Sequence, residues 1–224
     1  MDALPFPITQ SVLERLGISA SDSQWAELQK FHERLYEVNL QRNLTRIPEI
    51  EADVRHYAES LLVMEFLEGK EWLDIGCGPG FPSFLLALFA SDSHIASIDS
   101  NGKMIGFLRE CGLPNNTVLE KRMEECGLVE QFDSVTGRAV APLSIQLELS
   151  ARAVKMGGVV VPFRVEGESF DHAALKKIGL QLERVETRTL PDNRMRVFPI
   201  YRKVARTPLT FPRNWAAIKK KPLF

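Results

Sequence analysis

The chain has 224 residues, of which 45% are hydrophobic and 25% charged, and its formal net charge is −1. This length is enough for one sizeable α/β core, and no apolar run approaches the ~20 residues that a bilayer span needs. The first residues lack a basic stretch followed by an apolar core, and the three cysteines form no CxxC pair. We therefore expect a cytoplasmic protein with reduced thiols and no membrane partner.

The charges are divided along the chain. From Lys176 onward the sequence has 13 basic and three acidic residues, a net charge of +10, whereas residues 1–175 carry −11. Such a division predicts that the carboxyl-terminal region meets an anionic partner. The alternative is that these charges form an ordinary solvated surface.

Residues 1–68 show mostly helical patterns, and we interpret them as a helical amino-terminal extension. Ser21 is a suitable N-cap for a helix that carries an apolar stripe. The stripe repeats at steps of three and four residues, at Trp25, Leu28, Phe31, Leu35 and Val38. A second helix is predicted from about residue 50 to 66, separated from the first by Pro48.

Beyond residue 70, short apolar runs alternate with helical patterns. Strands are predicted near 71–76, 94–98, 116–120, 132–136, 157–162, 181–189 and 195–203, and helices near 81–91, 102–112, 142–155 and 168–178. This alternation is typical of parallel strands joined by crossover helices. The last two strands resemble a hairpin that adds an antiparallel strand, so we expect an α/β, Rossmann-like fold with a seven-stranded, mostly parallel sheet.

A glycine-rich loop follows the first predicted strand, with Gly76, Gly78 and Gly80 at alternate positions. Glycines there let the loop turn sharply and bring backbone N–H groups close to a ligand. A dinucleotide fingerprint needs its third glycine where Phe81 stands, and Pro82 removes an N–H donor that a pyrophosphate requires. The loop thus favours S-adenosylmethionine, while an NAD-dependent oxidoreductase remains the alternative.

Two aspartates flank this loop. Asp99 ends the second strand, 21 residues after Gly78, where a carboxylate can hold the ribose hydroxyls of the cofactor. The same spacing occurs in NAD sites. Asp74 lies two residues before Gly76 and is expected to reach the methionine ammonium, directly or through water. The four histidines and three cysteines lack metal-ligand spacing, so we expect no metal site.

Seven segments of the chain carry a resemblance to a known family. They read NLT at 43–45, RHYAESL at 55–61, WLDIGCGPGFP at 72–82, IDSNGK at 98–103, RMEE at 122–125, GRAVAPL at 137–143 and TFPRNWAAIKKKPL at 210–223. From about residue 10 onward the chain resembles the RsmG (GidB) family of bacterial rRNA methyltransferases. The resemblance implies a class I methyltransferase domain over 69–205. It also implies methyl transfer from S-adenosylmethionine to N7 of a guanine in the 530-loop region of 16S rRNA.

The resemblance also implies roles for individual residues. Cofactor contacts would fall on Gly76 and Phe81 in the loop, on Met123 and Glu124 beside the adenine, and on Arg138 near the methionine end. Guanine N7 offers a lone pair and carries no proton, so we expect positioning rather than a catalytic acid or base. The chain departs from the family pattern at three positions, Glu59, Ser83 and Arg164.

Several basic residues are candidates for binding RNA. They are Arg55, His56, Arg164, Arg213, Lys219, Lys220 and Lys221, with Arg138 shared between RNA and cofactor. For His56, a buried histidine that packs within the fold is the alternative. We expect a monomer that binds the small ribosomal subunit, or alternatively a ribosome-binding relative without turnover.

Residues 206–224 read as a mobile basic tail that contacts phosphates. Trp215 either stacks on an exposed base or anchors this tail. Deletion of the tail is predicted to weaken RNA binding and to leave cofactor affinity unchanged.

Overall fold

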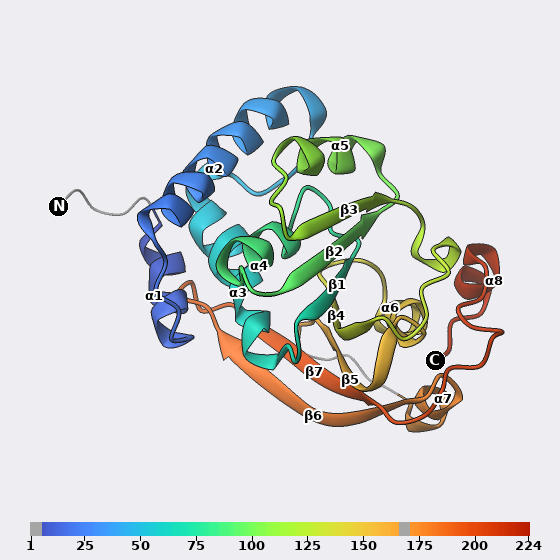
Figure 1. Cartoon of the computed structure of the whole chain (residues 1–224). Helices are drawn as coiled ribbons and strands as arrows, with labels where there is room; N and C mark the ends of the chain where they lie inside the picture. Colours follow the sequence, from blue (N-terminus) through green and yellow to red (C-terminus); the bar gives the residue numbers. More distant parts are fainter. Residues whose placement is uncertain (1–5, 166–170) are drawn as a thin grey trace.

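The computed structural model describes residues 6–165 and 171–224 and shows one seven-stranded sheet (Figure 1). The strands are β1 (Glu71–Ile75), β2 (His94–Asp99), β3 (Asn116–Glu120), β4 (Phe132–Gly137), β5 (Val154–Pro162), β6 (Leu180–Thr189) and β7 (Met195–Lys203). Their order is β3-β2-β1-β4-β5-β7-β6. Strands β1 to β5 pair in parallel, whereas β7 runs antiparallel to both β5 and β6. The predicted strands and the terminal hairpin are confirmed.

Successive strand residues point to opposite sides of the sheet, so consecutive apolar residues leave both faces hydrophobic. Helices cover both faces. Trp72 joins one hydrophobic cluster with α4 (Ser83–Phe89) and α5 (Gly102–Glu110). The next residue, Leu73, joins a second cluster with α6 (Leu143–Ala151) and α7 (His172–Lys177). Residues 168–170 of the predicted fourth helix lie outside the described part of the chain.

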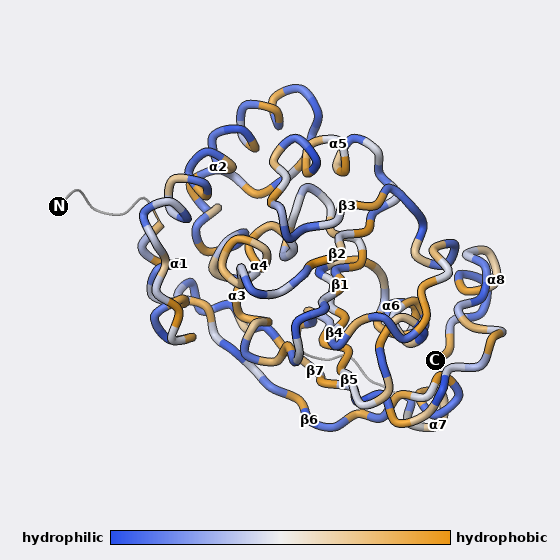
Figure 2. Tube along the Cα trace, in the orientation of Figure 1, coloured by the Kyte–Doolittle hydropathy of each residue, from blue (hydrophilic) through white to orange (hydrophobic). Residues whose placement is uncertain are grey.

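The amino-terminal extension packs on the α4 side of the sheet. It contains α1 (Pro7–Arg15) and α2 (Asp22–Arg42), and a capping box between Ser21 and Gln24 begins α2. Figure 2 shows hydrophobic and hydrophilic residues alternating along α2. The predicted apolar stripe is buried, and its Phe31 stacks on Phe84 of α4 with ring centroids 3.8 Å apart. The extension therefore shares a hydrophobic core with the sheet.

The second predicted helix, near residues 50–66, is not one continuous α-helix. It consists of η1 (Glu49–Glu51, 3-10), η2 (Asp53–Ala58, a π-helix), α3 (Glu59–Leu61) and η3 (Leu62–Phe66, 3-10). Outside groups bind this segment: the guanidinium of Arg138 donates to the Arg55 carbonyl at 2.7 Å, and the Asp53 carboxylate accepts from the amides of Ile8 and Thr9. A side chain that enters the backbone hydrogen-bond ladder of a helix distorts the helix at that point. π-Helical turns interrupt α-helices in this way, frequently at functional sites.

The carboxyl-terminal tail is docked, so the expectation of a mobile segment is wrong. It forms α8 (Trp215–Lys220), which Asn214 caps through the Ala217 amide, and Ile218 is completely buried. Before this helix, Arg213 contacts the fully buried carboxylate of Glu148 on α6. A buried carboxylate needs a hydrogen-bonded cation, and this requirement ties the tail to the body.

Within the described residues, no helix is long and apolar enough to cross a membrane. The three cysteines are free thiols, and Cys77, a residue of the glycine loop, is buried.

Candidate functional site

The glycine loop connects β1 to α4 with three residues in positive φ: Gly76 at 65°, Gly78 at 54° and Gly80 at 120°. Its first amides, of Gly76 and Cys77, donate to the Ile98 carbonyl at 2.7 and 3.1 Å, which fixes the loop against β2. A Cβ built on Gly78 would meet no atom within 4 Å. The backbone at Gly78 is therefore open to the approach of a ligand.

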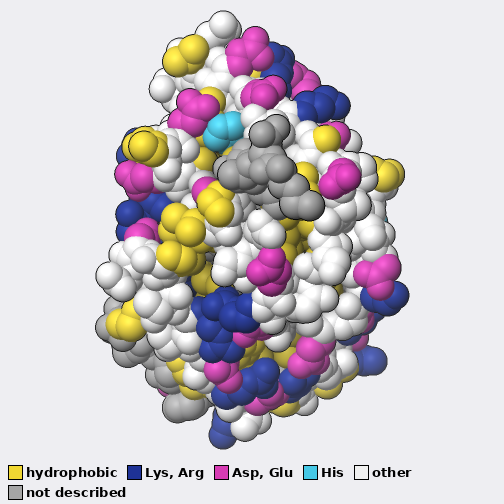
Figure 3. Space-filling view, turned by 90° about the vertical axis from the view of Figure 1, so that its left-hand side faces the viewer, with side chains coloured by type: hydrophobic (Ala, Val, Ile, Leu, Met, Phe, Trp, Pro, Cys, Tyr) yellow, Lys and Arg dark blue, Asp and Glu magenta, His cyan; other side chains and the backbone are white. Residues whose placement is uncertain are grey.

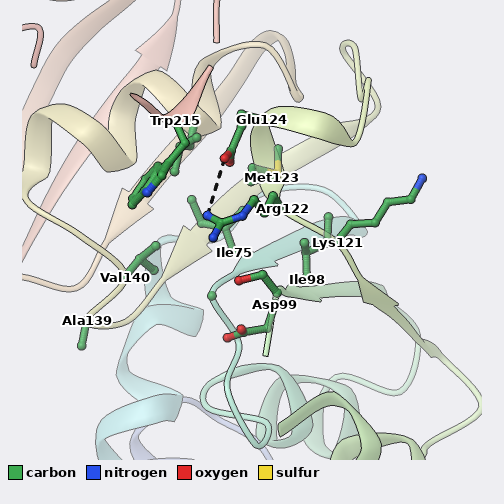
Figure 4. A pocket seen from close by; sticks show the side chains of 13 residues that line it. Ile75, Ile98, Asp99, Lys121, Arg122, Met123, Glu124, Ala139, Val140 and Trp215 are labelled. Atoms are coloured by element: carbon green, nitrogen blue, oxygen red, sulfur yellow. Dashed lines mark ion pairs between the residues drawn. The ribbon is translucent and has the colours of Figure 1, made fainter. Parts of the chain in front are cut away.

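A pocket of about 280 Å³ lies at the carboxyl ends of the parallel strands (Figure 4). Its lining comprises Ile75, Gly76, Ile98, Asp99, Ser100, Lys121, Arg122, Met123, Glu124, Ala139, Val140, Leu149 and Trp215. Open α/β sheets bind their ligands at this edge. Four of the predicted cofactor residues line the pocket: Gly76, Asp99, Met123 and Glu124.

Asp99 joins the glycine loop to the pocket. Its Oδ2 accepts the Gly78 amide at 3.0 Å, and its Oδ1 accepts the Asn101 amide at 2.8 Å. A carboxylate oxygen has two lone pairs, so each oxygen keeps capacity for another donor. Asp99 therefore holds the loop in shape and still has acceptors for a pair of hydroxyl groups.

Glu124 lies in the short 3-10 helix η4 (Met123–Glu125) on the pocket wall. Its side chain is 6% exposed, and its Oε1 is buried without a hydrogen bond. The nearest cation is Arg122, whose Nη1 lies 3.8 Å from that oxygen. Because an unpaired buried acceptor is unfavourable, Glu124 suits a ligand that brings an N–H donor, as the amino group of adenine does.

Asp74 is completely buried below the glycine loop and does not line the pocket. Its Oδ2 accepts the Ser83 amide at 3.0 Å, which caps the start of α4, while its Oδ1 has no hydrogen bond. Burial raises the pKa of Asp74 to about 7. Direct contact between Asp74 and a ligand in the pocket, which we expected as one possibility, does not fit this geometry.

Phe81 turns its side chain away from the pocket and into the amino-terminal layer. It is 4% exposed and stacks on His56, with centroids 4.0 Å apart and planes 11° apart. The Arg138 guanidinium lies 5.2 Å from the Phe81 centroid and 3.3 Å from His56 Nδ1. Since arginine only donates, Nδ1 accepts, and His56 Nε2 donates to Thr45 Oγ1 at 2.8 Å.

Burial first, and then the neighbouring Arg138 charge, lower the pKa of His56 to about 2. His56 is therefore neutral and buried, and the packing alternative describes it better than a contact with RNA.

An ion network surrounds Arg138. Glu59 is 5% exposed, and its two oxygens lie 3.4 Å from Arg138 Nη1 and 2.7 Å from Arg196 Nη2. Burial lowers the pKa of Arg138, while Glu59 opposes this change. Arg55 pairs with Glu51 at 2.7 Å. Arg138 follows the carboxyl end of β4, is held against residues 55–59 of the amino-terminal extension, and does not line the pocket.

Two of the predicted RNA-binding arginines are engaged inside the protein. Arg164 is 8% exposed and donates to the Ala141 carbonyl at 2.9 Å and to the side-chain oxygen of Gln146. Arg213 donates from Nε and Nη2 to the two carboxylate oxygens of Glu148, at 2.9 and 2.5 Å. Contact with RNA would require Arg164 to leave these partners, so the structure does not favour its predicted role, whereas the Arg213 side chain is 25% exposed and keeps its ion pair with Glu148 at the surface.

The three predicted tail lysines differ from these arginines. Lys219, Lys220 and Lys221 are exposed at the end of α8.

Over the described ranges 6–165 and 171–224, no group of His, Cys, Asp and Glu is arranged to hold a metal ion.

Nine of the 13 lining residues were not predicted as cofactor contacts, and Arg122 and Trp215 are the two among them with side chains suited to bind a ligand. Arg122 directly precedes Met123, which was predicted to contact the cofactor, so its place in the sequence already indicated that it lies near the site. Trp215 reaches the pocket only because α8 docks beside α6, and no local pattern encodes that docking.

The matching family model is described as GidB, rRNA small subunit methyltransferase G, and covers residues 24–194. A curated relative from Lactobacillus johnsonii, named ribosomal RNA small subunit methyltransferase G, is 33% identical over 94% of this chain and 96% of its own length. A protein of the same name from Geobacillus kaustophilus is 31% identical over the whole of both chains.

Solved methyltransferase structures share the fold. M. jannaschii TYW2 in complex with AdoMet matches 65% of this chain and 75% of its own with a TM-score of 0.51, at 15% identity. A TehB-like SAM-dependent methyltransferase from Corynebacterium glutamicum matches 76% of this chain and 98% of its own with a TM-score of 0.53, at 15% identity. The chain therefore has the fold of class I S-adenosylmethionine-dependent methyltransferases and belongs to the GidB family of rRNA small subunit methyltransferases G.

Proposed function

We propose that the chain binds S-adenosylmethionine in the pocket beside the glycine loop and methylates N7 of a guanine in the 530-loop region of 16S rRNA. One observation carries the assignment of the pocket: the buried Glu124 oxygen lacks a hydrogen-bond donor and lies in the same cavity as Asp99. Membership in a family of rRNA methyltransferases supports the reaction.

The pocket residues divide between the parts of the cofactor. Asp99 would accept the ribose hydroxyls, Met123 and Glu124 would hold the adenine, and the bare backbone at Gly76 and Gly78 would lie against the ligand. S-adenosylmethionine supplies a methyl carbon activated by its sulfonium. The chain's own task is to exclude water and hold the guanine in line with that carbon, since N7 needs no general base.

The methionine end would lie toward Arg138. The ion network of Arg138 with Glu59 and Arg196 gives it a fixed position beside the loop. Glu59 accepts hydrogen bonds from Arg138 and Arg196. Glu59, one of the three departures from the family pattern, therefore has a structural role.

An NAD-dependent oxidoreductase is disfavoured by the start of α4. The Ser83 amide is already bound to Asp74, and Pro82 has no amide hydrogen, so the helix offers a pyrophosphate no free donor there. A ribosome-binding relative without turnover would keep the same fold, and only an activity measurement separates it from an enzyme.

The 16S rRNA within the small ribosomal subunit is the proposed partner, and the cytoplasm is the proposed location. We assign the extension 1–68, the methyltransferase domain 69–205 and the tail 206–224 to one compact monomer.

The direct test is transfer of tritium from labelled S-adenosylmethionine into small subunits and into naked 16S rRNA. N7-methylguanine is then mapped in 16S rRNA from cells with and without the gene. A label at one guanine of the 530-loop region, lost with the gene, is expected. Calorimetry that detects NADH binding and no binding of S-adenosylhomocysteine would overturn the proposal.

A further inference from the structure

The carboxyl-terminal tail contributes a wall to the pocket. Trp215, the first residue of α8, lines the cavity opposite Asp99 and packs in the same hydrophobic cluster as Val140 and Leu149 (Figure 4). Two contacts hold the helix there: the ion pair of Arg213 with Glu148, and the completely buried Ile218. Trp215 is therefore fixed in the pocket wall.

The side chain of Arg122 reaches into the same space. Its guanidinium carbon lies 5.7 Å from the Trp215 ring centroid, and its Nη1 lies 3.8 Å from the buried Glu124 oxygen. A guanidinium is flat and carries N–H donors, and it stacks on aromatic rings. Arg122 thus places a flat group beside the Trp215 ring and N–H donors near the Glu124 oxygen that lacks a hydrogen bond.

An adenine ring has the same two features. It is flat, it stacks on aromatic side chains, and its amino group donates hydrogen bonds. We propose that Trp215 is a cofactor-binding residue that packs on the adenine of S-adenosylmethionine, and that the Arg122 side chain gives up this position when the cofactor binds. The inference rests on the proposed assignment of the pocket and replaces the prediction that the tail is irrelevant to cofactor affinity.

Calorimetry with S-adenosylhomocysteine and with adenosine tests this inference. Stacking of a base on an aromatic ring is worth enough that Trp215→Ala should weaken both ligands by about tenfold. The two losses should be equal, since both ligands carry the adenine. Trp215→Phe keeps a ring and should stay within about threefold of wild type. Arg122→Ala removes the competing side chain and should bind about threefold more tightly.

Tryptophan fluorescence distinguishes contact between Trp215 and the ligand from a purely structural role of Trp215. Bound adenine should quench part of the wild-type emission, and Trp215→Phe should bind the ligand without that quench. Trp72→Phe is the control, because Trp72 is a buried residue of β1 and is absent from the pocket lining. Thermal unfolding without ligand establishes that each variant is folded.

The outcomes separate two failures. Wild-type affinity in Trp215→Ala, with the quench retained in Trp215→Phe, would mean that Trp215 only anchors the tail. A wild-type protein that binds neither ligand would instead overturn the proposed pocket itself. Weaker binding in Arg122→Ala would contradict the proposed displacement of Arg122. It would not contradict the proposed packing of Trp215 on the adenine.

Discussion

His56 and Asp74 are both buried and respond to pH with opposite signs. His56 has a pKa of about 2 in the native protein against an ordinary 6.5, so below pH 6.5 the unfolded chain binds the extra proton. Acid therefore destabilises the fold through His56. Asp74 has a pKa of about 7 against an ordinary 3.8, so between these values the native state binds the extra proton. Acid therefore stabilises the fold through Asp74.

The two effects should largely cancel between about pH 4 and 6.5, and removing one should reveal the other. In urea unfolding, His56→Gln should become more stable as the pH falls from 7 to 4.5. Asp74→Asn should become less stable over the same range. One proton corresponds to a slope of about 1.4 kcal/mol per pH unit. Parallel profiles for wild type and both variants would show that neither group titrates as stated.

Gly78 permits a specific test of the loop. Valine at this position, with φ at 54°, is strained, and its side chain would occupy the open space beside Asp99. We expect Gly78→Val to weaken S-adenosylhomocysteine binding at least tenfold in calorimetry.

The matched control is Gly17→Val, because Gly17 has φ at 71° and equally open surroundings in a different part of the chain. Both variants should lose a similar amount of thermal stability, and only Gly78→Val should lose the ligand. Equal affinity in the two variants would mean that the ligand does not approach this backbone.

The residues that sequence reasoning found are those whose position depends on the local chain. Gly78 and Asp99 follow strand ends, and the ends of parallel strands meet at one edge of the sheet. Trp215 was found only as an aromatic residue in a tail, since its place in the pocket depends on contacts with α6. The burial of His56 and Arg164 likewise depends on partners far away in the sequence.

At the scale of elements, the docking of α8 depends on one buried ion pair. Glu148 is completely buried, and Arg213 satisfies both of its oxygens. Arg213→Met leaves that carboxylate without its cation and should cost roughly 3 kcal/mol in the free energy of unfolding, measured with urea. The double variant with Glu148→Gln should recover much of this loss, because no charge then remains buried.

Arg206→Met is the control for this pair. Arg206 is an exposed arginine in the same tail, so its loss should change the free energy of unfolding by less than about 0.5 kcal/mol. An Arg213→Met variant as stable as this control would show that apolar contacts alone dock the tail.

The central strands β1, β2, β4 and β5 were predicted well because each one contains a short, buried apolar run that ends near turn residues. The segment 49–66 was predicted as one helix because its apolar spacing is helical. Its π-helical stretch lies where Arg138, 83 residues further along the chain, donates to the Arg55 carbonyl. Periodicity reports which face of an element is buried, and it carries no information on a distant side chain that enters the helix.

At the scale of the whole molecule, folding partly offsets the charge division along the sequence, through five ion pairs among the described residues. The ion pairs that join the basic carboxyl-terminal region to the acidic remainder are Arg188–Glu65, Arg194–Glu51, Arg196–Glu59, Arg202–Glu68 and Arg213–Glu148. Figure 3 shows basic and acidic side chains intermingled on one face of the molecule. The anionic partner of this region stays a prediction, and the exposed Lys219, Lys220 and Lys221, rather than the paired arginines, are the candidates for contacting it.

These lysines should act on RNA and not on the cofactor. Each lysine–phosphate contact contributes about −0.7 to the slope of log affinity against log salt for single-stranded nucleic acid. Removing two contacts in Lys220→Ala/Lys221→Ala should make the slope shallower by about 1.4 in filter binding to 16S rRNA. The S-adenosylhomocysteine affinity should stay at the wild-type value, in contrast to Trp215→Ala.

The double variant Lys30→Ala/Lys70→Ala removes the same charge from exposed sites on the amino-terminal extension and before β1. It should keep the wild-type slope, because a uniform effect of net charge would otherwise change both variants equally. Equal slopes for the two double variants would show that RNA does not contact α8. Trp215 begins the six-residue helix α8, Lys220 ends it and Lys221 follows it, so separate losses would divide this segment into a cofactor-binding end and an RNA-binding end.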